Sequence, residues 1–136
     1  VTVLLNEEAT FLNIRNSLAE ISKIGKANDR ILIYFAGHGE TMDLTDGGEM
    51  GYLLPVDADI YNLYSTSISI NLLQDISEQS ESKHMLFLLD ACLGGMPIIR
   101  KQLQDYTGGG KTKAFPKYIQ KITQRINTKL TIWKFS

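Results

Sequence analysis

The chain has 136 residues, of which 43% are hydrophobic and 21% charged, and its formal net charge is −1. This length suits one domain with one core, and the composition is that of an ordinary globular protein. No window approaches the roughly 18 consecutive apolar residues that cross a bilayer, and a near-neutral chain is not typical of nucleic-acid binders, so neither a membrane nor a nucleic acid is an expected partner.

Cysteine usage and the first residues indicate a cellular setting. Cys92 is the one cysteine in the chain, which excludes an internal disulfide and fits a reducing compartment. The opening residues VTVLLN contain neither a basic stretch like that of a signal peptide nor an initiator methionine. We therefore expect a cytoplasmic domain that is part of a longer, multidomain chain.

The first third of the chain alternates between strand and helix patterns. Residues 1–5 form a short apolar, β-branched run that predicts a buried strand. Residues 9–24 carry apolar side chains at helical spacing, and Asn6 or Thr10 could cap that helix. Residues 31–36 are apolar throughout and predict a second buried strand, of the kind found in parallel sheets.

The middle of the chain continues this alternation after an interruption. Residues 37–49 are rich in glycine and acidic residues without periodicity, which predicts a loop. A short strand is expected over residues 51–54, a helix over 69–79 and a third long apolar strand over 84–89.

The last third is less regular. Residues 100–117 are basic and glycine-rich and predict a loop, residues 118–125 suggest a short helix, and residues 130–133 a last strand. Strands that alternate with helices predict an α/β domain with a largely parallel sheet.

Two reactive side chains follow apolar strands in this scheme. His38 comes just after residues 31–36, and Cys92 comes just after residues 84–89. Ligands of parallel sheets bind outside the carboxyl ends of the strands, and these ends share one edge. We therefore expect His38 and Cys92 to be neighbours in space although 54 residues separate them in sequence.

This pair has a chemical and a structural interpretation. A thiol with a pKa of about 8.5 needs a base or a positive neighbour to become a thiolate, and an imidazole supplies both. Gly37 and Gly39 flank His38, Gly94 and Gly95 follow Cys92, and the unobstructed N–H groups of glycines suit an oxyanion hole. In the structural interpretation Cys92 is a small buried side chain and His38 a turn residue. The residues alone leave the two interpretations about equal.

Two motifs add a family resemblance. The segments YFAGHG (residues 34–39) and LLDACLGG (residues 88–95) resemble the His and Cys boxes of the caspase-like cysteine peptidases. The caspase pattern is Q-A-C-[RQG]-G with the histidine about 50 residues upstream, and metacaspases carry Asp at the Gln position. The chain is similar to metacaspases and bacterial caspase-domain proteins, peptidase family C14, over residues 1 to about 132. Either box alone is weak evidence for this family, but the two boxes in this order and at this spacing are a specific signal.

The resemblance implies a fold. It is a caspase-like three-layer α/β/α sandwich with a mostly parallel sheet, and residues 1–136 would form a single, partial domain of this kind. Caspase-like domains begin with a central strand that precedes the one assigned to residues 1–5. From the resemblance we expect that first central strand to be missing from this chain, together with the second S1 carboxylate to which it leads in metacaspases.

The resemblance also implies residue roles. Cys92 would be the nucleophile, and His38 the base that assists it and protonates the leaving amine. The N–H groups of Gly39 and Cys92 would form the oxyanion hole. Asp90 would line the S1 pocket and pair with a P1 Arg or Lys of a peptide or protein substrate, as a carboxylate can with a guanidinium; from the residues alone, a strand-end cap stays open for Asp90.

The expected activity is therefore that of a cysteine endopeptidase that cuts after basic residues. The rival hypothesis is a catalytically inactive, truncated caspase-like module that acts in protein interaction. No cofactor is expected and no metal ligands are assigned, but calcium activation stays open because many metacaspases require calcium. The candidates for such a site, or for a solvated acidic loop, are Asp43, Asp46, Glu49, Asp57 and Asp59; they lack EF-hand spacing.

Overall fold

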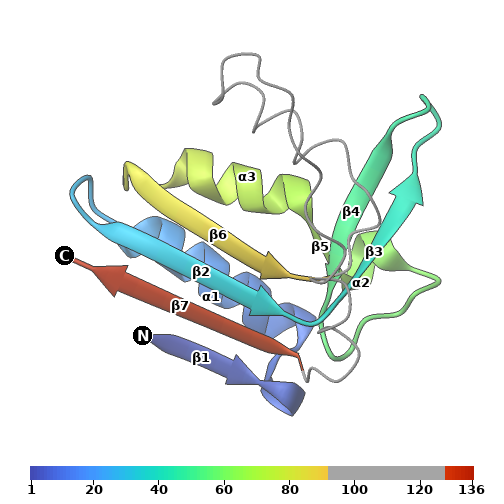
Figure 1. Cartoon of the computed structure of the whole chain (residues 1–136), viewed down its shortest axis with the longest axis horizontal. Coiled ribbons are helices and arrows are strands. Elements are labelled where there is room, and N and C mark those ends of the chain that lie inside the picture. The colour runs from blue at the N-terminus through green and yellow to red at the C-terminus, as the bar shows by residue number, and fades with distance from the viewer. Residues whose placement is uncertain (92–127) are drawn as a thin grey trace.

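The computed structural model describes residues 1–91 and 128–136. Cys92, the loop predicted for residues 100–117 and the helix predicted for 118–125 lie outside these residues. The described chain forms one four-stranded and one three-stranded sheet. The larger sheet has the order β1-β7-β2-β6, with bounds Thr2–Leu5, Lys129–Phe135, Arg30–Ala36 and His84–Asp90 (Figure 1).

Three strands of the larger sheet point the same way. β2 and β6 are parallel, and β7 is antiparallel to both β1 and β2, so β1, β2 and β6 share one direction and β7 opposes them (Figure 1). The predicted α/β class is confirmed, but the larger sheet is mixed rather than mostly parallel: of its three described strand pairs, β2–β6 is parallel and the two pairs that β7 makes are antiparallel. Between β1 and β2, in the middle of the sheet, lies β7, which comes from the other end of the described chain. The resemblance gave no strand of this chain to that central position.

The prediction of a buried strand over residues 1–5 is wrong in one respect. The strand forms as β1, but it is an edge strand in which Val3 and Leu5 remain 44% and 46% exposed. Only the opposite side of the strand, at Leu4, packs against the core. A short apolar run cannot distinguish an edge strand from a central one, because both need apolar residues on at least one face.

The first long helix, α1, spans Phe11–Ile24. Thr10 rather than Asn6 is its cap: the Thr10 hydroxyl accepts the N–H of the third helical residue at 3.3 Å. The carboxylate of Asp57 accepts the N–H of Phe11 at 2.7 Å. Two of the N–H groups that a helix start leaves without partners are therefore satisfied, which fixes the position where the helix begins.

The second long helix, α3, spans Ile70–Gln79 and lies next to α1. Ser69 caps it by accepting the N–H of Leu72 at 3.2 Å. The short helix α2 (Leu63–Thr66) precedes it. None of the helices in the described ranges is long and apolar enough to cross a membrane.

The core lies between α1 and α3 and one face of the larger sheet. Its most buried aliphatic and aromatic side chains are Ile14, Leu18, Ile21, Ile31, Ile33, Phe35, Leu73, Ile76, Leu130 and Ile132. The strand residues in this set alternate along β2 and β7, as they must when one face of a strand is buried. Both long helices thus cover the same face, and the described residues provide two of the three layers that the resemblance implies.

The loop predicted for residues 37–49 is wrong. This segment begins with β3 (His38–Asp43), which forms an antiparallel hairpin with β4 (Glu49–Leu54), and β5 (Ile68–Ser69) completes the smaller sheet. The turn places Gly47 at a φ of 85°, a conformation in which a side chain is strained. His38, Glu40 and Met42 are exposed on one face of β3, and the other face carries Gly39, Thr41 and Asp43, so the strand has no apolar alternation to detect.

An ion pair between a partly exposed lysine and a buried aspartate joins β7 to the segment before β2, and it gives a pH prediction. Lys134 lies 3.0 Å from the buried carboxylate of Asp29, which also accepts the N–H of Lys26 at 2.8 Å. The hydrogen bond from Lys26 and then the interaction with Lys134 lower the pKa of Asp29 below its ordinary value of 3.8. A carboxylate with a lower pKa in the folded state stabilises the fold above its ordinary pKa, and this contribution is lost as the pH falls through the folded pKa.

We expect Asp29→Asn to lower the free energy of unfolding at neutral pH and to lose this effect in acid. Urea unfolding of both proteins at neutral pH and at a pH below 3.8 measures the difference. A gap between the two proteins that does not change with pH would contradict an ionised, paired Asp29.

Candidate active site

The carboxyl ends of β2 and β6 meet at one edge of the larger sheet. Ala36, the last residue of β2, is in register with Asp90, the last residue of β6. The N–H of Gly37 continues this ladder by donating to the Asp90 carbonyl at 3.1 Å. The strands that lead to His38 and Cys92 are thus parallel neighbours, as the sequence predicts, although Cys92 itself lies outside the described residues.

His38 is the first residue of β3 and its side chain is exposed. Its main chain pairs with Leu54 of β4, so the hairpin fixes its position one residue beyond the end of the parallel ladder. An exposed imidazole at this position is accessible to a substrate. It contributes little to the core, in contrast to the apolar residues of β2 that precede it.

The N–H of Gly39 points away from the hairpin partner. At the turn, the N–H of Leu44 donates to the Gly48 carbonyl at 2.7 Å, which makes these two residues a hydrogen-bonded pair. Such pairs alternate with non-hydrogen-bonded pairs along an antiparallel ladder, so Gly39 and Leu53, opposite each other five residues further down, form a non-hydrogen-bonded pair. Thr41 follows the same rule, because its N–H bonds to a neighbouring glutamate side chain at 3.0 Å instead of to β4. An oxyanion donor requires a free N–H of this kind.

The carboxylate of Asp90 lies on the face of the sheet that α1 and α3 do not cover. Residues two and four positions earlier on the same face, Leu88 and Leu86, are 46% and 56% exposed. Tyr34 occupies the neighbouring position in β2, opposite Leu88. Burial raises the pKa of Tyr34, and the Asp90 carboxylate raises this pKa further, by its charge and as a hydrogen-bond acceptor.

Tyr34 is a contact of Asp90 that the sequence analysis missed. The signal was available: Tyr34 precedes Ala36 by two residues and therefore shares its face of β2. The missing information was the register that pairs Ala36 with Asp90, which no feature of either strand specifies by itself.

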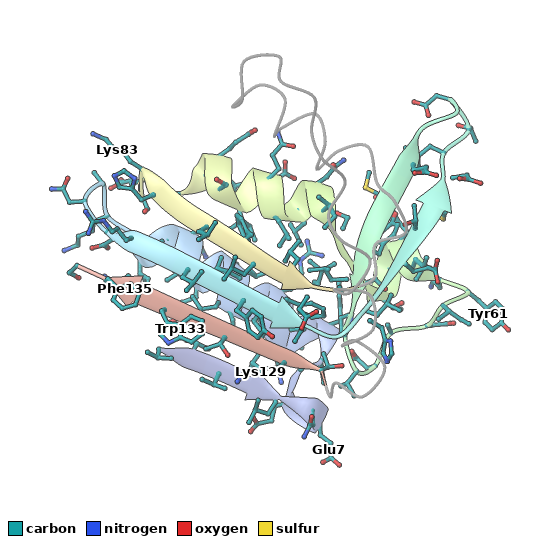
Figure 2. All side chains as sticks on the ribbon, viewed as in Figure 1. Glu7, Tyr61, Lys83, Lys129, Trp133 and Phe135 are labelled. Carbon is teal, nitrogen blue, oxygen red and sulfur yellow. The ribbon has the colours of Figure 1, made fainter. Side chains whose placement is uncertain are left out.

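Lys129 also lies at this edge. As the first residue of β7, it is in register with Leu5 on one side and with Ala36 on the other. Its side chain is half-buried. Figure 2 shows Lys129 at the end of the sheet where β2 and β6 terminate, and Phe135 at the opposite end of β7. The antiparallel direction of β7, which the sequence did not predict, brings this lysine to the candidate site.

Three of the five acidic residues considered for calcium accept hydrogen bonds from the main chain. Asp46, Asp57 and Asp59 each accept a main-chain N–H, at 2.7–3.0 Å. Within residues 1–91 and 128–136 no three His, Cys, Asp or Glu side chains gather as metal ligands. The described residues therefore give no support to a calcium site.

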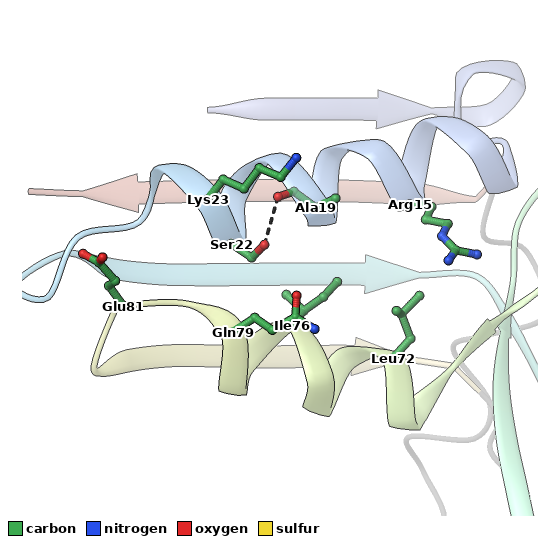
Figure 3. A pocket seen from close by; sticks show the side chains of 8 residues that line it. All are labelled: Arg15, Ala19, Ser22, Lys23, Leu72, Ile76, Gln79 and Glu81. Atoms are coloured by element: carbon green, nitrogen blue, oxygen red, sulfur yellow. Dashed lines mark hydrogen bonds between the residues drawn. The ribbon is translucent and has the colours of Figure 1, made fainter.

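A groove between α1 and α3 lies on the other, helix-covered face of the sheet (Figure 3). Its lining residues are Arg15, Ala19, Ser22, Lys23, Leu72, Ile76, Gln79 and Glu81. The one hydroxyl among them, that of Ser22, donates to the Ala19 carbonyl at 2.9 Å, and no histidine lines the groove. The groove therefore lacks a nucleophile with a base, and the candidate active site remains the strand-end edge.

Comparison with known families agrees with this geometry. The family model for the caspase domain, peptidase family C14, matches residues 1–131. The chain belongs to the caspase domain family. No curated protein matches the chain. Membership confirms the resemblance found in the sequence, and it implies a cysteine-type peptidase with peptide or protein substrates. In this caspase domain the described residues carry the histidine hairpin and the strand that leads to the cysteine box.

Proposed function

We propose that this caspase domain is a cysteine endopeptidase that hydrolyses peptide bonds with Cys92 and His38, after Arg or Lys. The observation that carries the proposal is the parallel pairing of β2 and β6, with the Gly37 N–H on the Asp90 carbonyl at 3.1 Å. Cys92 follows Asp90 by two residues, and two extended residues span at most about 7 Å. This short connection supports the proposal that Cys92 acts at the edge at which His38 begins the hairpin.

The reaction follows from the chemistry of these groups. His38 takes the proton of the Cys92 thiol, and the thiolate attacks the carbonyl carbon of the substrate, so that a C–S bond forms and the carbonyl oxygen becomes an oxyanion. The N–H groups of Gly39 and Cys92 bind that oxyanion. The C–N bond then breaks, and the imidazolium gives its proton to the leaving amine. A water molecule, deprotonated by His38, hydrolyses the thioester and regenerates the thiol.

The preference for a basic P1 residue rests on Asp90. Its side chain is half-buried on the face of the sheet that the two long helices leave open, and the main-chain N–H at this strand end bonds to its carbonyl rather than to its carboxylate. The carboxylate can therefore pair with a guanidinium or ammonium group. Tyr34 lies beside it and offers a hydroxyl that orients it.

Cleavage of fluorogenic peptides with P1 Arg, Lys or Asp, with and without calcium, tests this proposal. We expect cleavage after Arg or Lys that Cys92→Ala abolishes without changing the circular dichroism spectrum. Cleavage after Asp alone would remove Asp90 from the P1 subsite. A folded chain that cuts none of the peptides would contradict the peptidase.

A further inference from the structure

Two charged residues of opposite sign lie on either side of Ala36. Lys129 of β7 and Asp90 of β6 are each in register with Ala36 of β2. Residues in register on neighbouring strands direct their side chains to the same face. Both side chains therefore share the face that α1 and α3 leave open, and the small, buried Ala36 is the one residue between them.

The two charges are close but not in contact. Strands are about 4.8 Å apart, so the two Cα atoms are separated by about 10 Å. In the part of the chain that the structure describes, the one ion pair is between Lys134 and Asp29. The ammonium group of Lys129 is thus not bound to the Asp90 carboxylate, and each can act on a third charge that approaches this edge of the sheet.

Among the described residues of β2, β6 and β7, the other charged groups on this face are remote. Tyr34 and Thr131, one row back from the edge, are uncharged at neutral pH. Arg30 and His84 share the face but begin β2 and β6, six residues or about 20 Å away along the strands. The screening length is about 10 Å at about 0.1 M salt, so Lys129 is, among the lysine and arginine side chains of the described β2, β6 and β7, the one whose charge reaches a ligand of Asp90.

We propose that Lys129 is a specificity-determining residue, which weakens the binding of a basic P1 side chain to Asp90. The inference builds on the proposed function, because it takes Asp90 as the P1 subsite. A guanidinium that pairs with Asp90 lies about 10 Å or less from the ammonium of Lys129. Two like charges at about 10 Å, in a medium between protein surface and water and at low salt, repel each other enough to weaken binding about two- to tenfold.

The consequence is a site that discriminates less strongly for Arg and Lys than a lone carboxylate would. The negative charge of Asp90 and the positive charge of Lys129 largely cancel at longer range. Asp90 still selects a cation at contact distance, where a direct hydrogen-bonded pair outweighs a charge farther away. Lys129 therefore sets how much tighter a basic P1 residue binds than a neutral one.

Binding of benzamidinium, a non-hydrolysed analogue of the arginine side chain, tests the inference with the full chain. Titration followed by amide chemical shifts at Tyr34 and Gly37 gives the affinity. At low salt we expect Lys129→Gln to tighten binding about two- to tenfold, Lys129→Glu to tighten it further, and Lys129→Arg to leave it unchanged. Lys83→Gln removes the same charge at an exposed position before β6, at the far end of the sheet, and should have no effect (Figure 2).

The outcomes separate this inference from the peptidase proposal. Equal affinity for Lys129→Gln and the unmodified chain overturns the role of Lys129, and so does the absence of binding to either. An affinity that rises in Lys129→Gln and is lost in Asp90→Asn supports it, even if no Cys92-dependent cleavage occurs. A melting temperature close to that of the unmodified chain is the folding control for each variant.

Discussion

Replacing His38 by alanine is expected to lower the rate of peptide cleavage about 100- to 10,000-fold, the usual contribution of a positioned general acid–base group. His38 has two tasks in the proposed reaction: it takes the thiol proton of Cys92 and later protonates the leaving amine. Without the imidazole, a thiol with a pKa of about 8.5 is mostly protonated at neutral pH. The amine would then leave without a proton donor.

The fold should not change, because the His38 side chain is exposed and its main chain stays in the β3–β4 ladder. Met42→Ala is the matched control: Met42 is 37% exposed and lies on the same face of β3, four residues further along the hairpin. We expect Met42→Ala to keep full activity and both variants to keep the melting temperature. Cleavage by His38→Ala at near the normal rate would exclude the imidazole as the base.

Most of the main elements could be predicted because burial leaves a periodic pattern. The helix over residues 9–24 and the strand over 31–36 match α1 and β2 within two residues. Each of these segments turns apolar side chains to the core that they share, and that spacing is visible in the sequence. The fold class follows from their alternation, and the neighbouring ends of β2 and β6 follow from the fold class.

The rest depends on contacts that leave no such pattern. β3 and β4 are held together by main-chain hydrogen bonds, and the side chains of β3 are mostly exposed, so residues 37–49 read as a loop. The position of β7 depends on which strand edges are unpaired when the sheet assembles. A run of apolar residues does not specify its neighbouring strands. For the same reason His38 could be placed at the edge from the sequence, whereas Lys129 could not.

Removing side-chain volume from the middle of β7 should strongly destabilise the domain. Ile132 is 2% exposed and belongs to the core cluster, in register with Thr2 of β1 and Ile33 of β2. Truncation of a buried Ile to Ala costs about 2–5 kcal/mol in transfer and cavity terms. Domains are stable by about 5–15 kcal/mol in total, so Ile132→Ala should unfold at a much lower urea concentration.

Phe135→Ala provides the control on the same strand. Phe135 is larger than Ile132 but 55% exposed, at the end of β7 remote from the candidate site, and exposed substitutions usually change stability by about 0.5 kcal/mol or less. If β7 completes the sheet, Ile132→Ala is the more harmful change although it removes fewer atoms. An equal, small effect of both variants would contradict a β7 that belongs to the cooperative core.

The Ile132→Ala variant also bears on the candidate active site, because β7 carries both the buried Ile132 and Lys129, which we propose to affect specificity. The same strand that inserts Ile132 into the core begins with Lys129, in register with Ala36 at the site edge. Loss of β7 pairing would expose both neighbouring strands and remove the lysine from Asp90 at once. A destabilised Ile132→Ala chain that remains folded in the absence of urea should therefore still bind benzamidinium with the affinity of the unmodified chain, whereas a chain in which β7 detaches should bind it as Lys129→Gln does.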